Sequence, residues 1–270
     1  MSDPLPVTEE EEEEVKVYPK LHLSIHSLIE SSQSQHGLRH ADYVQYRSYC
    51  TRRLSRLRHA KPFRLEISKI PVTKEKTDKK AARHAFKPAP YYRDSALLQQ
   101  IAKTHENFML VELYSAERSW SYAMELKAEY ENHHPNNNHD SGNGAVKGKS
   151  RGHFMARLKK AVQFANRLEE MASSASDEIT ITEAKGYASW MRGNLHLEKS
   201  EYEAACIEYA TALAICRHLA QGYLGKESEE EKESKEQLEM RDYFTARAEN
   251  IIEPMLRFCQ YELKVCISSK

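Results

Sequence analysis

Hydrophobic residues recur at intervals of three and four along most of the chain, which is the spacing that places them on one face of an α-helix. Leu21, Ile25 and Leu28 form the first such pattern, and Gly37 follows it as a helix stop signal. Helices are predicted over residues 19–33, from about residue 39, and over 91–130, 153–172, 181–199, 201–224 and 236–265. Pro254 should kink or interrupt the last of them. Nine Gly and nine Pro in 270 residues do not give the turn-dense pattern of a β-sandwich or barrel, so the sequence predicts an all-α fold.

One stretch, residues 190–215, has the small-residue spacing of a tetratricopeptide helix pair. Gly193 is followed by Ala205, Tyr209 and Ala212. The match is partial, because His196 stands where the repeat usually has a tyrosine. An ordinary amphipathic hairpin with small residues at its crossing has the same pattern, so both interpretations stay open.

Other stretches are polar, with few bulky apolar residues to offset the entropy of ordering them. We expect residues 1–17 to be an acidic disordered tail and residues 18–270 to form one helical domain. Within that domain, flexible segments are expected near 62–90, 131–152 and 225–236.

Charge is distributed unevenly along this chain of zero net charge. Residues 36–93 hold sixteen basic and four acidic groups, whereas the segments on both sides are acidic. The imbalance is strongest in residues 39–64, where the only acid is Asp42. Their basic residues are Arg39, Arg47, Arg52, Arg53, Arg56, Arg58, Lys61 and Arg64. Such a basic block inside an acidic protein is typical of a polyanion binder.

The basic block also carries a helical pattern. At 100° per residue, the buried stripe of this helix consists of Tyr43, Tyr46, Cys50, Leu54 and Leu57. Arg52 and Arg56 fall on the opposite face, Arg47 and Arg58 flank the stripe on one side, and Arg53 flanks it on the other. Tyr49 is expected to project with the arginines, where it could stack on an unpaired base.

A solvated helix face is the ordinary explanation for surface charge, but such a face usually carries acids four residues from its bases. Here Arg52 and Arg56 are a like-charged pair at that spacing, and no acid occurs between Tyr43 and Leu65. Most of the bases are arginine, whose planar fork binds phosphate oxygens in pairs. The pattern therefore favours nucleic-acid binding by this helix.

The remaining candidate sites are weaker. His22 with His26, and His36 with His40, have the i, i+4 spacing of a helical metal pair, but neither pair has an obvious third ligand. We predict no metal site, no cofactor and no catalytic residue.

Three further expectations concern side chains outside the basic helix. Asp94, Glu106, Glu112 and Glu117 are assigned to helix surfaces, Trp120 and Trp190 to core packing, and Arg157, Lys159 and Lys160 either to a second phosphate contact or to a solvated helix start.

Three stretches resemble a known family: QHGLRHADYVQYRSYCTRRLSRLR at 35–58, AERSWSYAMELK at 116–127 and RLKKAVQFANRLEEM at 157–171. Together they resemble the RNA-binding region of the sixty-eight-kilodalton protein of the eukaryotic signal recognition particle. The resemblance implies an all-α domain with tetratricopeptide-like hairpins that binds and bends the particle RNA near its branch point. The arginine-rich helix of that family enters the RNA, and the matching residues are Arg39, Arg47, Arg52, Arg53, Arg56 and Arg58.

The resemblance also implies a biological setting. The protein would be a non-catalytic structural subunit in co-translational protein targeting to the endoplasmic reticulum. It would be cytoplasmic, with nucleolar assembly and association with the endoplasmic reticulum, but it would not insert into a membrane. Its partners would be the particle RNA and other particle proteins, with the seventy-two-kilodalton partner binding a C-terminal region absent from this sequence. The alternative function is a tetratricopeptide-type scaffold whose basic helix binds an acidic protein.

Overall fold

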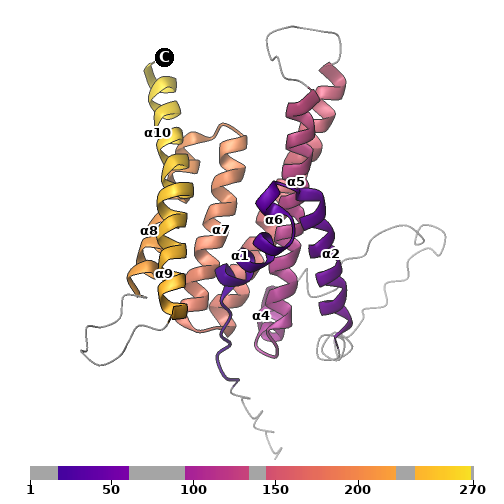
Figure 1. Cartoon of the computed structure of the whole chain (residues 1–270), viewed down its shortest axis with the longest axis vertical. Helices are drawn as coiled ribbons and strands as arrows, with labels where there is room; N and C mark the ends of the chain where they lie inside the picture. The colour runs from indigo at the N-terminus through magenta and orange to yellow at the C-terminus, as the bar shows by residue number, and fades with distance from the viewer. Residues whose placement is uncertain (1–17, 61–94, 134–143, 223–234, 269–270) are drawn as a thin grey trace, which may run out of the picture.

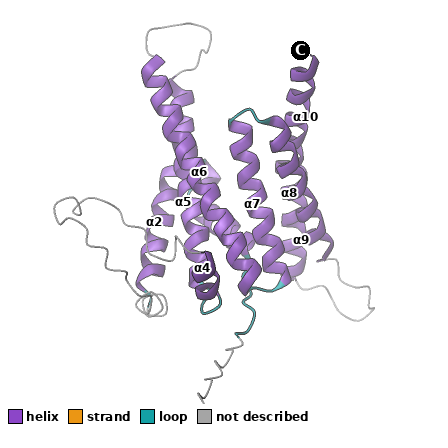
Figure 2. Cartoon of the chain, turned by 180° about the vertical axis from the view of Figure 1, so that it is seen from behind, coloured by secondary structure: helices purple, strands orange, loops and turns teal. Residues whose placement is uncertain are grey.

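The computed structural model describes residues 18–60, 95–133, 144–222 and 235–268, and within them the fold is all-α, as predicted (Figure 1, Figure 2). The expected acidic tail and most of the expected flexible segments lie outside these residues. A single parallel bridge joins Leu21 to Ser176. The elements are α1 Ile25–Gln35, the 3-10 helix η1 Leu38–His40, α2 Tyr43–His59, α4 Ser95–Ala102, α5 Asn107–His133, α6 Gly144–Ala175, α7 Glu178–Glu198, α8 Tyr202–Gly222, α9 Lys235–Arg247, the π-helix η4 Ala248–Ile252 and α10 Glu253–Ser268.

The helices pack in a row in which each long helix lies against the next. Helix α2 packs on α5, α5 on α6, α6 on α7, α7 on α8, and α8 on α9 and α10, so α2 and α10 lie at opposite ends (Figure 1). Two hydrophobic clusters fill the row. The larger lies among α1, α2 and α4 to α7, and the smaller lies among α8, α9 and α10. The basic helix α2 therefore has one face on the larger core and one face toward solvent.

The single helix expected over residues 91–130 is interrupted in the structure. Helix α4 ends at Ala102 and α5 begins at Asn107. Two side chains satisfy the backbone between them: Thr104 Oγ1 donates to the carbonyl of Ile101 at 2.7 Å, and His105 Nδ1 accepts from the Asn107 amide at 3.0 Å. Such local bonds compete with helix continuation, and they leave no Gly or Pro signal in the sequence.

Both ends of the stretch 131–152, which the sequence predicted to be flexible, are helical in the structure. Residues 131–133 belong to α5 and residues 144–152 belong to α6, while the residues between them lie outside the described part. Residues 144–152 contain glycines but also alanine, lysine and arginine, which favour helix. Helix α6 thus extends a basic segment further along α5 than the sequence pattern indicated.

Helices α7 and α8 form the close hairpin that the small residues predicted. A Cβ atom added at Gly193 would lie 2.7 Å from a ring carbon of Tyr209, so only glycine permits this approach. The Tyr209 hydroxyl donates to Asn194 Oδ1 at 2.9 Å across the same crossing. The last predicted helix is interrupted, as expected, because the π-helix η4 separates α9 from α10 just before Pro254.

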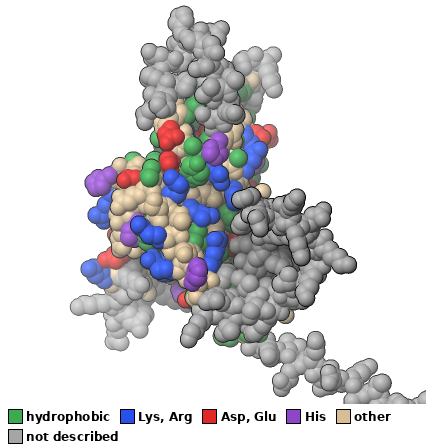
Figure 3. Space-filling model, turned by 90° about the vertical axis from the view of Figure 1, so that its right-hand side faces the viewer, with side chains coloured by type: hydrophobic (Ala, Val, Ile, Leu, Met, Phe, Trp, Pro, Cys, Tyr) green, Lys and Arg blue, Asp and Glu red, His purple; other side chains and the backbone are tan. Residues whose placement is uncertain are grey.

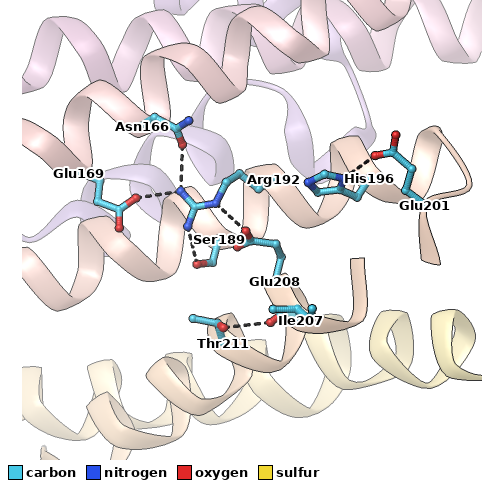
Figure 4. Close-up of polar contacts among 9 residues, drawn as sticks. All are labelled: Asn166, Glu169, Ser189, Arg192, His196, Glu201, Ile207, Glu208 and Thr211. Carbon is cyan, nitrogen blue, oxygen red and sulfur yellow. Dashed lines mark hydrogen bonds and ion pairs between the residues drawn. The ribbon is translucent and has the colours of Figure 1, made fainter. Parts of the chain in front are cut away.

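One arginine ties three of the helices together. The guanidinium of Arg192, on α7, donates to Glu169 at 2.8 Å and to Asn166 at 2.9 Å on α6, to Glu208 at 3.0 Å on α8, and to Ser189 at 3.0 Å on its own helix (Figure 4). All of its nitrogen atoms have acceptors, and its charge is balanced by two carboxylates. This arginine is a structural crosslink between α6, α7 and α8.

Candidate nucleic-acid interface

A tight turn sets the start of α2. Gly37 has a φ of 108°, and a Cβ atom there would lie 2.9 Å from the Asp42 carbonyl oxygen, so the turn requires glycine. The Asp42 side chain then caps α2 by accepting from the Gln45 amide at 2.8 Å. The single acid of residues 39–64 therefore caps the start of the helix.

The two faces of α2 match the predicted helical wheel. Tyr46, Cys50, Leu54 and Leu57 are buried, and Tyr43 is half-buried. Arg52 and Arg56 are exposed on the opposite face, one turn apart, and neither has a hydrogen-bond or ion-pair partner within the described residues. Figure 3, which views this side of the molecule, shows Lys and Arg side chains spread over its surface.

The flanking position of Arg47 gives it a partner that the sequence pattern missed. Its guanidinium donates to both carboxylate oxygens of Glu125, on α5, at 2.7 and 3.0 Å, and it lies 4.5 Å from the centre of the Tyr122 ring. Glu125 is 78 positions away in sequence. The lack of acids near Arg47 in the sequence therefore did not mean that Arg47 lacks a counter-charge.

Arg53 and Tyr49 lie toward the core. The Arg53 guanidinium is 5.7 Å from the centre of the Tyr114 ring, and its Nε atom is buried without a hydrogen-bond partner. The Tyr49 ring is half-buried and stacks on the His36 ring at 3.7 Å, with Tyr114 edge-on at 6.1 Å. The expected projection of Tyr49 with the exposed arginines is therefore wrong, because His36, just after α1, and Tyr114, on α5, draw it inward.

The remaining basic candidates differ in exposure and in their partners. Arg39 is exposed, and its Nε donates to Ser34 Oγ at 2.8 Å. Arg58 is half-buried near the carboxyl of Glu112. Lys61 and Arg64 lie outside the described residues. Of the seven predicted site residues that the structure describes, Arg52 and Arg56 have the geometry most available to a ligand.

A buried carboxylate holds α2 to the core. Glu117 is 1% exposed and accepts hydrogen bonds from the hydroxyls of Tyr46 at 2.6 Å and Tyr187 at 2.7 Å, and from the Gln33 amide at 2.8 Å. The burial of both tyrosines, together with the charge of Glu117, raises the pKa of each hydroxyl well above its usual range. The assignment of Glu117 to a helix surface was wrong, since three donors from α1, α2 and α7 compensate its burial.

Glu112 was also assigned to a surface, and it is also 1% exposed. Burial raises the pKa of its carboxyl to about 7, although the charges of Arg167 and Arg58 act in the opposite direction. The nearest guanidinium nitrogen of Arg167 is 3.9 Å away, which is too far for a hydrogen bond. Glu106 is exposed as expected, and Asp94 lies outside the described residues.

The tryptophans and histidines also have defined surroundings. Trp120 and Trp190 are half-buried and pack against the larger and the smaller core cluster, respectively. His22 Nδ1 lies 2.6 Å from Asp177 Oδ2, and the ring of His26 is buried without a hydrogen-bond partner. No group of three potential metal ligands occurs within the described residues.

The family of the chain follows from comparison with known proteins. A family model described as "RNA-binding signal recognition particle 68" matches residues 38–268, from η1 through α10. This chain belongs to the SRP68 family. The resemblance of the three sequence stretches is thereby confirmed, and the matched region includes all of α2.

SRP68 relatives extend the comparison. A "Signal recognition particle subunit SRP68" of Dictyostelium discoideum is 32% identical over 249 residues, covering 91% of this chain and 33% of the relative. The protein of the same name from Drosophila melanogaster is 30% identical over 239 residues, covering 87% of this chain and 32% of the relative. The chain thus spans about a third of the length of these SRP68 relatives.

The SRP68 fold is supported by a solved structure, titled "Structure of the SRP68-RBD from Chaetomium thermophilum". Its identity to this chain is 24%, the alignment covers 89% of this chain and 90% of that one, and the TM-score is 0.61. None of the helices in the described part of the chain is long and apolar enough to cross a membrane.

Proposed function

We propose that the exposed arginine face of α2 binds RNA of the signal recognition particle, and that the chain acts there as a structural, non-catalytic subunit. The carrying observation is the pair Arg52 and Arg56, which project one turn apart without a partner within the described residues. Two like charges at this spacing destabilise a helix slightly. An RNA backbone would supply the missing counter-charge, since each guanidinium binds phosphate oxygens through two parallel hydrogen bonds.

The buried side of α2 supports the same proposal. Tyr46, Cys50, Leu54 and Leu57 pack into the core, and Glu117 ties Tyr46 to α7. The helix is therefore already packed in place before any ligand arrives. Binding does not have to order the backbone of α2, so that entropic cost is avoided. A preorganised helix of this kind fits recognition of a defined RNA shape.

The finer parts of the function rest on the family. We propose that binding bends the particle RNA near its branch point, and that the chain thereby supports co-translational targeting from the cytoplasm to the endoplasmic reticulum. Other particle proteins, including the seventy-two-kilodalton subunit, would be further partners. Energy transfer between dyes on the two RNA arms should change when the chain is added, and an unchanged signal would contradict bending.

The second candidate is a scaffold whose α2 binds an acidic protein segment. The tetratricopeptide-like hairpin of α7 and α8 favours it, because such hairpins often form protein-binding surfaces. The scarcity of apolar anchors counts against it, since Val44 is the only exposed large hydrophobic residue of α2, whereas protein interfaces are rich in aromatic side chains.

A titration separates the two candidates. The purified chain is titrated with the particle RNA, with an unrelated RNA duplex of equal length, and with a poly-glutamate peptide. The RNA-binding proposal predicts tightest binding to the particle RNA. Preference for the peptide would support the scaffold, and equal affinity for the two RNAs would leave only nonspecific charge binding.

A further inference from the structure

A second basic site lies beside α2, in a pocket of about 180 Å³ between three helices. Among the described residues, no Asp or Glu lines it. Such a volume accommodates several water molecules or one tetrahedral oxyanion. The lining includes Arg47 and Thr51 from α2, Arg118 and Tyr122 from α5, and Arg157 and Lys160 from α6.

The pocket gathers four cations, Arg47, Arg118, Arg157 and Lys160, and the carboxylate of Glu125 is bonded to Arg47. Burial lowers the pKa of Lys160, and the positive charges of Arg157, Arg118, Arg167 and Arg58 lower it further. The ammonium thus lies among like charges. An anion in the pocket would relieve this repulsion, because opposite charge nearby stabilises the protonated amine.

Aromatic and helical packing hold the cations in place. The guanidiniums of Arg47 and Arg157 lie 4.5 and 5.0 Å from the centre of the Tyr122 ring, and His153 contacts that ring edge-on at 5.4 Å. The Lys160 ammonium lies 5.8 Å from the centre of the Phe164 ring. Because these side chains come from different helices, the pocket exists only in the folded protein and differs from a solvated run of lysines.

We propose that this pocket binds one phosphate group of the RNA backbone, so that the RNA interface continues from α2 across α5 to α6. The inference rests on the proposed RNA-binding function and adds to it a second contact with residues outside the arginine-rich helix. Lys160 and Arg157 supply the donors from α6. The Thr51 hydroxyl donates to the Arg47 carbonyl at 2.9 Å and keeps that side of the pocket fixed.

The chain offers a matched control for the test. Lys160→Gln removes a pocket cation, whereas Lys159→Gln makes the same change at the preceding position of α6, which is exposed and does not line the pocket. Lys160→Arg restores the charge. Affinity for the particle RNA is measured over a range of salt concentrations, and thermal melting checks that each variant folds.

Lys160→Gln should bind the RNA roughly tenfold more weakly than Lys159→Gln, as expected for loss of a charge-assisted contact. Its log K against log[salt] slope should be shallower by about 0.7 to 0.9, and Lys160→Arg should recover most of the affinity. If Lys160→Gln fails to fold, Arg157→Gln takes its place with the same expectation.

Equal affinity of the Lys159 and Lys160 glutamine variants, with the parent still binding RNA, would overturn the pocket and leave the α2 proposal standing. If the parent itself does not bind the particle RNA, the proposed function fails, and this inference fails with it.

Discussion

Arg192 on α7 and the pair Arg52 and Arg56 on α2 have the same chemistry and opposite surroundings. Arg192 is bonded to Glu169, Glu208 and two neutral side chains, with every nitrogen directed at an acceptor of the protein (Figure 4). Arg52 and Arg56 extend into solvent without a partner in the described residues. Arg192 makes all of its hydrogen bonds within the fold, whereas Arg52 and Arg56 remain available to a ligand.

This difference shows why a count of basic residues does not identify a binding site. Arg47 and Arg52 are five positions apart in one basic helix, yet Arg47 is paired with Glu125 and Arg52 is not. The pair with Glu125 occupies the Nε and Nη2 donors of Arg47 and balances its charge, so Arg47 offers a phosphate less than Arg52 does. Availability, and not charge alone, separates the structural arginines from those proposed to bind RNA.

The largest effect is expected from removing the available pair. Arg52→Ala with Arg56→Ala should lower affinity for the particle RNA about 100-fold, or roughly 2.7 kcal/mol, because two charge-assisted phosphate contacts are lost. The melting temperature should change little, since exposed side chains without partners contribute little to folding. A large drop in melting temperature with unchanged RNA affinity would show that Arg52 and Arg56 are structural arginines like Arg192.

The opposite pattern is expected at Arg192. Arg192→Ala leaves the carboxylates of Glu169 and Glu208 without their shared partner, and we expect a loss of about 2 kcal/mol in the free energy of unfolding. RNA affinity of the folded fraction should match the parent. Chemical denaturation measures the first quantity and a titration the second, and a selective loss of RNA affinity would show that Arg192 contacts the ligand.

Glu112 tests an intermediate case, in which the arginines are near but do not neutralise the acid. Burial raises its pKa from an ordinary value near 4.5 to about 7 in the folded chain. Between those values the folded protein holds a proton that the unfolded chain has released, so stability falls as the pH rises through this window.

Glu112→Gln removes that titration. The variant should be roughly 1 to 2 kcal/mol more stable than the parent at pH 8, and the advantage should vanish below pH 4.5. Glu183, whose pKa burial also raises to about 7, titrates in both proteins and cancels in the difference. Denaturation at several pH values measures the effect. A Gln variant less stable than the parent at pH 8 would mean that Arg167 neutralises Glu112 effectively.

The smallest change replaces the available arginines by lysine. Arg52→Lys with Arg56→Lys keeps the charge but removes the planar fork, and affinity for the particle RNA should fall about tenfold, or 1.4 kcal/mol. Binding to an unrelated duplex at the same salt concentration should hardly change. Equal affinity of variant and parent for both RNAs would reduce α2 to a patch of positive charge.

Much of the fold could be predicted because it depends on local patterns. The buried stripe of Cys50 and Leu54, the hairpin at Gly193 and the interruption near Pro254 each leave a periodic or single-residue signal. The break before α5 left none, since it depends on hydrogen bonds of the Thr104 and His105 side chains. Neither residue type is a helix breaker by itself.

The site was less predictable because its distinctions depend on contacts between distant helices. The wheel placed Arg52 and Arg56 correctly, but only the packing of α5 on α2 brings Glu125 to Arg47. Glu117 was assigned to the surface because a lone glutamate in a helix usually lies there, and its donors come from three other helices. The pocket at Lys160 likewise requires three helices at once.

The most direct test of the account is the salt dependence of RNA affinity for the parent chain. If α2 and its surroundings neutralise about six phosphates, log K should fall with log[salt] at a slope of roughly −4 to −5. The Arg52→Ala, Arg56→Ala variant should give a slope shallower by about 1.4 to 1.8, since two counter-charges are removed. A parent slope near zero, or a variant slope equal to that of the parent, would contradict binding through the available arginines.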